Sequence, residues 1–371
     1  MAPSCSSRKK GKKKVSVESV DVVGIDRISN LPDSILCFIL SFLPTLYSVR
    51  TSLLSKRWKL LWTQVPTIRI NARHKDEISF TTPNDKGKLI EKIVSGILLH
   101  HNAPSLDILY LHVEGKISKL SLWINDAIAK NIKHLDLQTS FTESIEVPEN
   151  LFICKTLESL KLYDLQVMIR GGVQLSRLHT LVLYFVTFGD EECFHKIVNG
   201  CPKLETLCFI KIFDDWDFMP TILVSSRTLK KFDMTFSGYY KPMVFEIRAP
   251  SLEYLSISNC FKRQLILNSL PSLLEVYIDL NDVYTANEVG EISYSNSITK
   301  LVQDVQHANS LSVTQNTIKY FGNATTPLPQ LTRLSKLAIK VICCQWNNIL
   351  FLLESSVNLE VLILQKVSQT L

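Results

Sequence analysis

The chain has 371 residues, of which 46% are hydrophobic and 20% are charged, a composition that excludes a disordered protein. One globular core rarely grows to this length, so we expect about two domains or one elongated repeat array. The net charge is +6, but the first 14 residues hold six basic side chains and no acid, which leaves the remainder neutral. That balance argues against nucleic acid as a partner of the globular part.

Residues 1–24 are expected to form a disordered basic tail. The basic run at residues 8–14 lacks the apolar stretch of a secretory signal, and no apolar run approaches the ~20 residues of a membrane-spanning helix. The nine cysteines include no CxxC pair, and most lie in apolar segments, as reduced cysteines do. We therefore expect an intracellular protein with no membrane partner, located in the nucleus, the cytoplasm or both. The tail fits a nuclear-import signal and a solubilising end equally well.

Residues 31–62 form a short and strongly apolar segment with two prolines and two tryptophans. Pro32 suits the first turn of a helix, where its missing N–H has no partner to lose, and Pro44 ends that helix. Thr45 and Ser55 can cap two further short helices. The spacing of apolar residues in the first helix predicts a wide apolar stripe, formed by Ile35, Leu36, Ile39, Leu40 and Leu43.

This stripe is broader than two short helices should cover, so we expect part of it to dock another protein. The alternative is a small bundle whose apolar side chains pack only against each other. In the third helix Trp58, Leu61 and Trp62 share one face. For the two tryptophans, interface contact and internal bracing both remain open.

The segment DRISNLPDSILCFILSFLPTLYSVRTSLLSKRWKLLW resembles a plant F-box, the module that docks onto the Skp-type adaptor of SCF ubiquitin ligases. The likeness includes the LP opening, the TSLLSKRW centre and the closing LW. It departs at Leu46-Tyr47, where relatives usually carry a lysine followed by an acid. The resemblance implies adaptor contacts from Leu31, Pro32, Ile35, Leu36, Ile39, Leu43 and Val49, with Trp58 and Trp62 completing or bracing the interface.

The remaining chain repeats the pattern L-x-x-L-x-L, with apolar swaps, at eleven places. Nine of the ten steps between them are 21–26 residues long, within the 20–29 residues of a leucine-rich repeat. The remaining step of 35 residues would hold a polar insertion at residues 281–297. Leu160 and Leu162 alternate with polar neighbours, as in a strand with one buried face. No unit can bury that face alone, so the units should stack into a parallel array, with return helices at residues 190–198 and 346–353.

Residues 121–137 and 171–209 look like the repeat region of plant F-box/leucine-rich-repeat proteins, and residues 334–366 are similar to the start of their C-terminal FBD segment. We therefore expect an α/β fold: a short N-terminal helical F-box, then an irregular leucine-rich-repeat solenoid with parallel strands on one face. The expected parts are the tail at 1–24, the F-box at 25–68, a linker and helical lead-in at 69–104, repeats at 105–333, and a truncated FBD-like segment at 334–371.

The sequence offers no set of residues for chemistry. It contains no HExxH, GxSxG, GxGxxG or phosphate-loop pattern, and its cysteines lack zinc-site spacing. Asp214, Asp215 and Asp217 lack the spacing of a calcium loop and fit a solvated loop. We therefore expect no catalytic, metal or cofactor site, and a protein that is not an enzyme.

The resemblance implies a substrate-recognition subunit of an SCF-type E3 ubiquitin ligase. The F-box would hold the Skp-type adaptor, and through it a cullin, while the repeats would hold an unknown target protein for ubiquitination by proximity alone. The alternative is a non-degradative leucine-rich-repeat scaffold. Six exposed strand positions are candidates for the target-recognition face, although they could equally be ordinary solvated side chains: Glu158, Lys161, Thr180, Glu205, Lys230 and Glu253.

Overall fold

The computed structural model of this protein describes eleven stretches of the chain. They are residues 27–28, 30–72, 83–115, 117–139, 146–213, 221–238, 244–259, 264–280, 288–321, 324–341 and 346–366. The basic tail and the aspartates at 214, 215 and 217 lie outside the described residues. Among the helices described, none is long and apolar enough to cross a membrane.

The N-terminal part is helical. It contains α1 (Asp33–Leu40), α2 (Thr45–Arg50) and two short 3-10 helices, η1 (Thr51–Leu53) and η2 (Trp58–Gln64). Pro32 and Pro44 stand directly before α1 and α2, where a missing N–H costs nothing. The third predicted helix is present as η2, but it begins at Trp58 and is a 3-10 helix, which is wound more tightly than an α-helix.

The repeats build one twelve-stranded sheet in which every pair of neighbours is parallel. This confirms the predicted parallel solenoid. In spatial order the strands are β1 (Thr67–Asn71), β2 (Ile108–His112), β3 (His134–Gln138), β4 (Ser159–Tyr163), β6 (Thr180–Tyr184), β8 (Thr206–Phe213), β10 (Lys231–Gly238), β12 (Tyr254–Ser258), β14 (Glu275–Asp279), β15 (Ser310–Thr314), β16 (Lys336–Val341) and β17 (Val361–Lys366).

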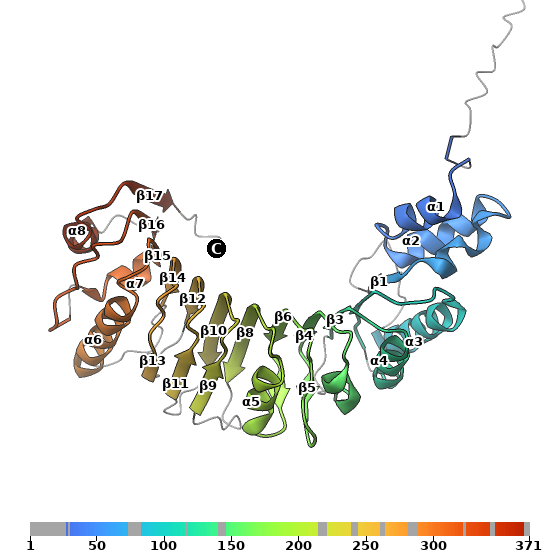
Figure 1. Ribbon diagram of the computed structural model, residues 1–371, viewed down its shortest axis with the longest axis horizontal. Helices are drawn as coiled ribbons and strands as arrows, with labels where there is room; N and C mark the ends of the chain where they lie inside the picture. The colour runs from blue at the N-terminus through green and yellow to red at the C-terminus, as the bar shows by residue number, and fades with distance from the viewer. Residues whose placement is uncertain are drawn as a thin grey trace, which may run out of the picture.

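The sheet lines the inner side of an arc, and α3 to α6 lie on its outer side (Figure 1). Two small parallel sheets also lie on the outer side: β9 (Thr221–Ser225), β11 (Val244–Arg248) and β13 (Gln264–Leu267), and β5 (Gln166–Val167) with β7 (Thr187–Phe188). The helices of this part of the chain are α3 (Pro83–His100), α4 (Leu120–Ala129), η3 (Glu149–Ile153), α5 (Glu192–Asn199), α6 (Glu288–Asp304), α7 (Gln315–Ile318) and α8 (Trp346–Ser355).

Both predicted return helices are present, as α5 and α8. Asp190 Oδ1 accepts a hydrogen bond from the Cys193 N–H at 2.8 Å, so Asp190 satisfies a free donor in the first turn of α5. The long step between β14 and β15 contains a helix, α6, rather than only an irregular insertion.

The strand side chains that point away from the inner side of the arc, toward the outer helices, form one continuous core that runs the length of the array. Leu160 of β4 pairs in register with Leu181 of β6, and both are fully buried. Each such leucine contributes about 1.5–3 kcal/mol by leaving water. Because every strand presents its apolar residues at the same register, each repeat covers the core face of its neighbour.

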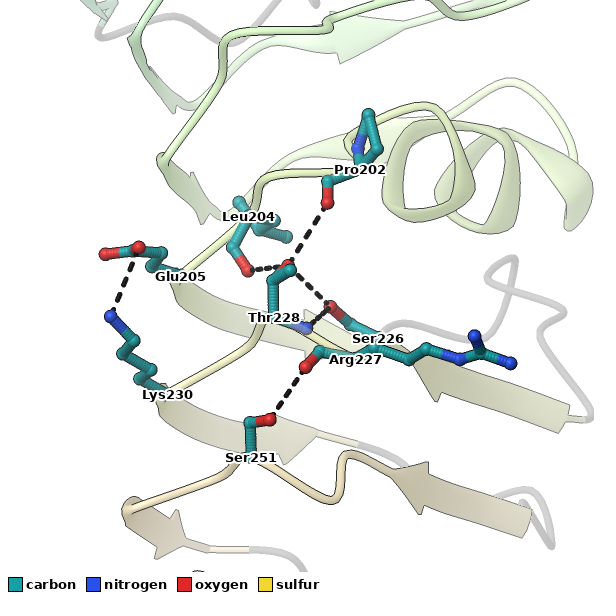
Figure 2. Close-up of polar contacts among 8 residues, drawn as sticks. All are labelled: Pro202, Leu204, Glu205, Ser226, Arg227, Thr228, Lys230 and Ser251. Atoms are coloured by element: carbon teal, nitrogen blue, oxygen red, sulfur yellow. Dashed lines mark hydrogen bonds and ion pairs between the residues drawn. The ribbon is translucent and has the colours of Figure 1, made fainter.

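Side-chain hydrogen bonds also join neighbouring repeats. Thr228 Oγ1 donates to the Leu204 carbonyl and Ser251 Oγ to the Arg227 carbonyl, each at 2.8 Å (Figure 2). Thr156 Oγ1 donates in the same way to the Ile132 carbonyl at 2.8 Å. In each case the donor stands just before the first leucine of its repeat, and the acceptor lies in the preceding repeat. These bonds satisfy carbonyls that the strands leave unpaired.

Candidate functional site

The helical N-terminal part has a small core of its own. Its buried members come from both ends of the segment: Leu36, Cys37, Leu40, Trp58, Leu61 and Val65. Two predicted adaptor contacts, Leu36 and Trp58, are therefore inside this cluster and not on the surface. For Trp58 this position agrees with the bracing alternative. For Leu36 it differs from the expected direct contact, because a side chain packed under α1 supports the surface from beneath.

The opposite face of α1 is apolar and exposed. Two predicted contact residues, Ile35 and Ile39, lie there, and a third, Leu43, is exposed in the turn that follows α1. Sequence reasoning missed Phe38 and Phe42, which are 64% and 68% exposed and whose rings meet edge to face, with centroids 4.9 Å apart. Together these five residues form what we call the α1 stripe. An apolar group this exposed on a short helix is typical of a surface that binds a partner.

More exposed leucines continue beyond α2. Leu53 is 87% exposed, and Leu54 and Leu60 are also largely in water. None of the three was predicted as an adaptor contact from the sequence. Of the other predicted contacts, Pro32 is exposed, while Leu31 and Val49 are half-buried.

A polar clamp holds the beginning of α1 against the residues before η2. Arg57 Nη2 lies 2.6 Å from Asp33 Oδ1, and the same guanidinium donates to the Leu31 carbonyl. Both side chains are partly exposed, so the pair contributes at most about 1 kcal/mol. Cys37 Sγ contacts the Leu61 carbonyl at 3.5 Å, and burial raises the pKa of this thiol, with a smaller contribution from Asp33. Cys37 is thus a packing residue and not a reactive thiol.

The helical part is fixed to the repeats by apolar and polar contacts. Leu46 and Trp62 pack against the repeat core, which places Trp62 as a brace between the two parts. Thr45 Oγ1 accepts a hydrogen bond from the Arg69 N–H of β1 at 2.8 Å. The Asn102 N–H donates to the Thr63 carbonyl at 2.7 Å.

Buried His101 completes this junction. Its Nε2 lies 2.9 Å from the Val65 carbonyl, and its Nδ1 lies 3.0 Å from Lys130 Nζ. Burial, with a smaller effect of the Lys130 charge, lowers the pKa of His101. A neutral ring fits both contacts, because Nε2–H then donates to Val65 and Nδ1 accepts from the Lys130 ammonium.

The predicted target-binding residues separate into two groups. Lys161 and Thr180 lie on strands and face the inner side of the arc, and Lys161 Nζ is 3.7 Å from Asp136 Oδ2. The others stand one residue before a strand, along the edge where the strands begin: Glu158, Glu205, Lys230 and Glu253.

Charges along this edge partly neutralise one another. Glu205 Oε1 lies 3.2 Å from Lys230 Nζ (Figure 2), and Glu158 Oε1 lies 3.5 Å from Arg177 Nη2.

Among the described residues, no group of three or more His, Cys, Asp or Glu side chains could hold a metal ion.

Comparison with known proteins covers both parts of the chain. A family model for the F-box domain matches residues 28–69, and a model for the LRR repeats of FBD-associated F-box protein At5g56370 matches residues 120–273. F-box/FBD/LRR-repeat protein At1g13780 of Arabidopsis thaliana is 30% identical over 94% of this chain and 80% of its own length. F-box/LRR-repeat protein At4g14096 of the same plant is 29% identical over 92% of this chain and 73% of its own length.

Proposed function

This chain belongs to the plant F-box/FBD/LRR-repeat family, and from that membership we propose that it is the substrate-recognition subunit of an SCF-type E3 ubiquitin ligase. F-box/LRR proteins are generally non-catalytic adaptors, and neither matching family model is an enzymatic domain. The F-box would bind a Skp-type adaptor and through it a cullin. The repeats would hold a target protein, whose lysines then react because they are held near a charged conjugating enzyme.

The exposed α1 stripe is the observation that carries this proposal. Phe38 on α1 and Phe42 in the turn after it remain mostly in water although their segment has a core of its own. Aromatic anchors dominate protein interfaces, and burying these rings in a complex would recover the free energy lost by exposing them. We propose that the adaptor covers Ile35, Phe38, Ile39, Phe42 and Leu43, with Leu31, Pro32, Val49, Leu53 and Leu54 around them.

Co-purification with a Skp-type adaptor tests this proposal. The full chain is co-expressed with the adaptor, either unchanged or with Phe38→Ser and Phe42→Ser together. We expect the double variant to lose about tenfold or more of the bound adaptor, because two anchors are removed. Since neither ring is buried in the free chain, the melting temperature of the double variant should be unchanged.

Leu122→Ser is the matched control, because Leu122 is 56% exposed on α4, outside the F-box residues 28–69. This variant should retain the adaptor. Equal recovery of adaptor by the double variant and by the unchanged chain would show that the docking assignment is wrong.

A further inference from the structure

Charge is unevenly distributed over the inner face of the sheet. On each strand, the side chains that face the inner side of the arc alternate with the core leucines. Toward the F-box these include Arg69, Asp136 and Lys161, and from β10 onward they include Lys231 and Asp233. The two strands between them, β6 and β8, present no charged side chain on this inner face. Their residues on it are Thr180, Val182, Tyr184, Thr206, Cys208, Ile210 and Ile212. The middle of the array is therefore an uncharged window with charged residues on both sides.

An aromatic group lies where the strands of this window end. Tyr163 of β4 and Tyr184 of β6 are partners in register, and their ring centroids are 5.5 Å apart. Phe185 follows with its centroid 4.3 Å from that of Tyr184. All three side chains are only half-buried. Phe185 does not belong to the core formed by the described residues, so its ring is part of the surface.

The backbone at Phe185 is strained. Its φ is +53°, in the left-handed region that bulky residues avoid. Asp164 after β4 and Asn259 after β12 occupy the same place in their repeats, with φ values of 56° and 54°. In all three the N–H donates to the next strand, at 3.0 Å to Tyr184, 2.8 Å to Ile210 and 2.9 Å to Asp279 for Asp164, Phe185 and Asn259 respectively. Val113 after β2 and Thr139 after β3 make the same bond without a positive φ, so the left-handed backbone belongs to only some of the repeats. Asp and Asn adopt that conformation more readily than Phe.

Backbone strain at an aromatic residue that lies outside the core points to a role in binding. We propose that Tyr184, Phe185, Val182 and Ile210 bind an uncharged segment of the target protein that carries aliphatic or aromatic side chains. This inference rests on the proposed function, because the target is the protein that a ligase receptor would hold. A charged segment would lose hydration over β6 and β8 without meeting an opposite charge, whereas an apolar segment buries its surface against the rings.

Selection from a phage-displayed library of random peptides tests the inference, with the full chain, co-expressed with a Skp-type adaptor, as bait. We expect the selected peptides to share a core of aliphatic and aromatic residues without charge. One of them, synthesised with a fluorescent label, is then titrated with each variant by fluorescence anisotropy. Tyr184→Ser and Phe185→Asn should each weaken its binding by about tenfold.

Phe185→Asn distinguishes recognition from simple packing. Asparagine accepts the left-handed conformation, as Asn259 does, so this variant should keep or raise the melting temperature while it loses the peptide. A ring that only stabilised the fold would lower the melting temperature when removed. Ile153→Asn is the control, because Ile153 is a 52% exposed apolar residue in η3, and it should bind the peptide normally.

Several outcomes would overturn the inference. They are the enrichment of no peptide or of charged peptides, and equal peptide binding by Phe185→Asn and the unchanged chain. Self-association that light scattering detects and that Phe185→Asn abolishes would instead identify a second copy as the occupant. Adaptor recovery is measured on the same samples. If the chain fails to hold the adaptor but still binds the peptide through Phe185, the proposed function is wrong and the peptide-binding surface is still supported.

Discussion

The two ends of the twelve-stranded sheet are built differently. Ile70 of β1 and Leu364 of β17 occupy the same core-facing row, yet Ile70 is 0% exposed and Leu364 is 43% exposed. Ile70 belongs to the repeat core, together with residues of α3. The F-box covers the outer edge of the same strand, because α2 lies against β1 and Thr45 accepts a hydrogen bond from the Arg69 N–H. The F-box therefore also acts as the cap that a solenoid needs at its end.

β17 has no such cover within the part of the chain that the structure describes. It ends the sheet order, and its four apolar residues are all more than 40% exposed: Val361, Leu362, Ile363 and Leu364. In a repeat array each unit is stabilised by the neighbours on both sides. The covered end should therefore be stable and sensitive to substitution, and the open end should be tolerant.

Ile70→Ala and Leu364→Ala measure this asymmetry directly. Ile70→Ala should lower the free energy of unfolding by about 3 kcal/mol, since it leaves a cavity in the repeat core. Leu364→Ala should lower it by less than about 1 kcal/mol, because water already reaches that side chain. Urea unfolding followed by circular dichroism gives both values. Equal losses would mean that the F-box does not protect β1.

His101 should make the covered end sensitive to pH. Its folded pKa is lowered, so above the unfolded value of about 6.5 both states are neutral and its contribution is present in full. As pH falls below that value, the unfolded chain binds a proton that the folded chain resists. Stability is then lost with a slope of up to about 1.4 kcal/mol per pH unit, until the folded pKa is passed.

The pH effect is isolated by comparing melting temperatures at pH 7.5 and 5.5 for the unchanged chain and for His101→Gln. The other histidines contribute equally to both proteins, so the unchanged chain should lose more stability than the variant on acidification. Identical losses would show that the Val65–His101–Lys130 contact is not coupled to protonation.

The smallest effect on stability is expected for Ile363→Lys on the open edge. The same row holds an arginine, Arg69, at the covered end. Adding a charge to an exposed edge strand should change the free energy of unfolding by no more than about 0.5 kcal/mol. It should nevertheless reduce aggregation, measured as light scattering during incubation at 37 °C, because a charged edge resists pairing with another chain. Leu122→Lys on α4 is the control and should leave the aggregation rate unchanged.

The repeats were predictable because their physical cause is local. The spacing of inward residues such as Leu160 and Leu162 sets both the strand and its buried face. Which side of α1 is buried was not predictable, since this helix is apolar on nearly all sides. Residues far along the chain, Trp58 and Leu61, decide that Leu36 points inward and Phe38 outward.

The inner surface was harder to predict for two reasons. Glu205 and Lys230 precede their strands by one residue, so a small error in strand boundaries placed edge residues on the inner face. Phe185 gave no local signal, because its left-handed backbone is unexpected for phenylalanine. Alignment of the repeats with one another would have found it, since Asp164 and Asn259 stand at the same place.

The hydroxyl hydrogen bonds made just before the first leucine of a repeat share one direction. Thr156, Thr228 and Ser251 each donate to a carbonyl of the repeat that precedes them (Figure 2 shows the latter two). Removal of a repeat from the β17 side would therefore expose a carbonyl oxygen, which water can readily satisfy. Removal from the F-box side would leave a half-buried hydroxyl without its acceptor. Fraying, and gain or loss of whole repeats over evolution, should accordingly proceed more easily from the β17 end.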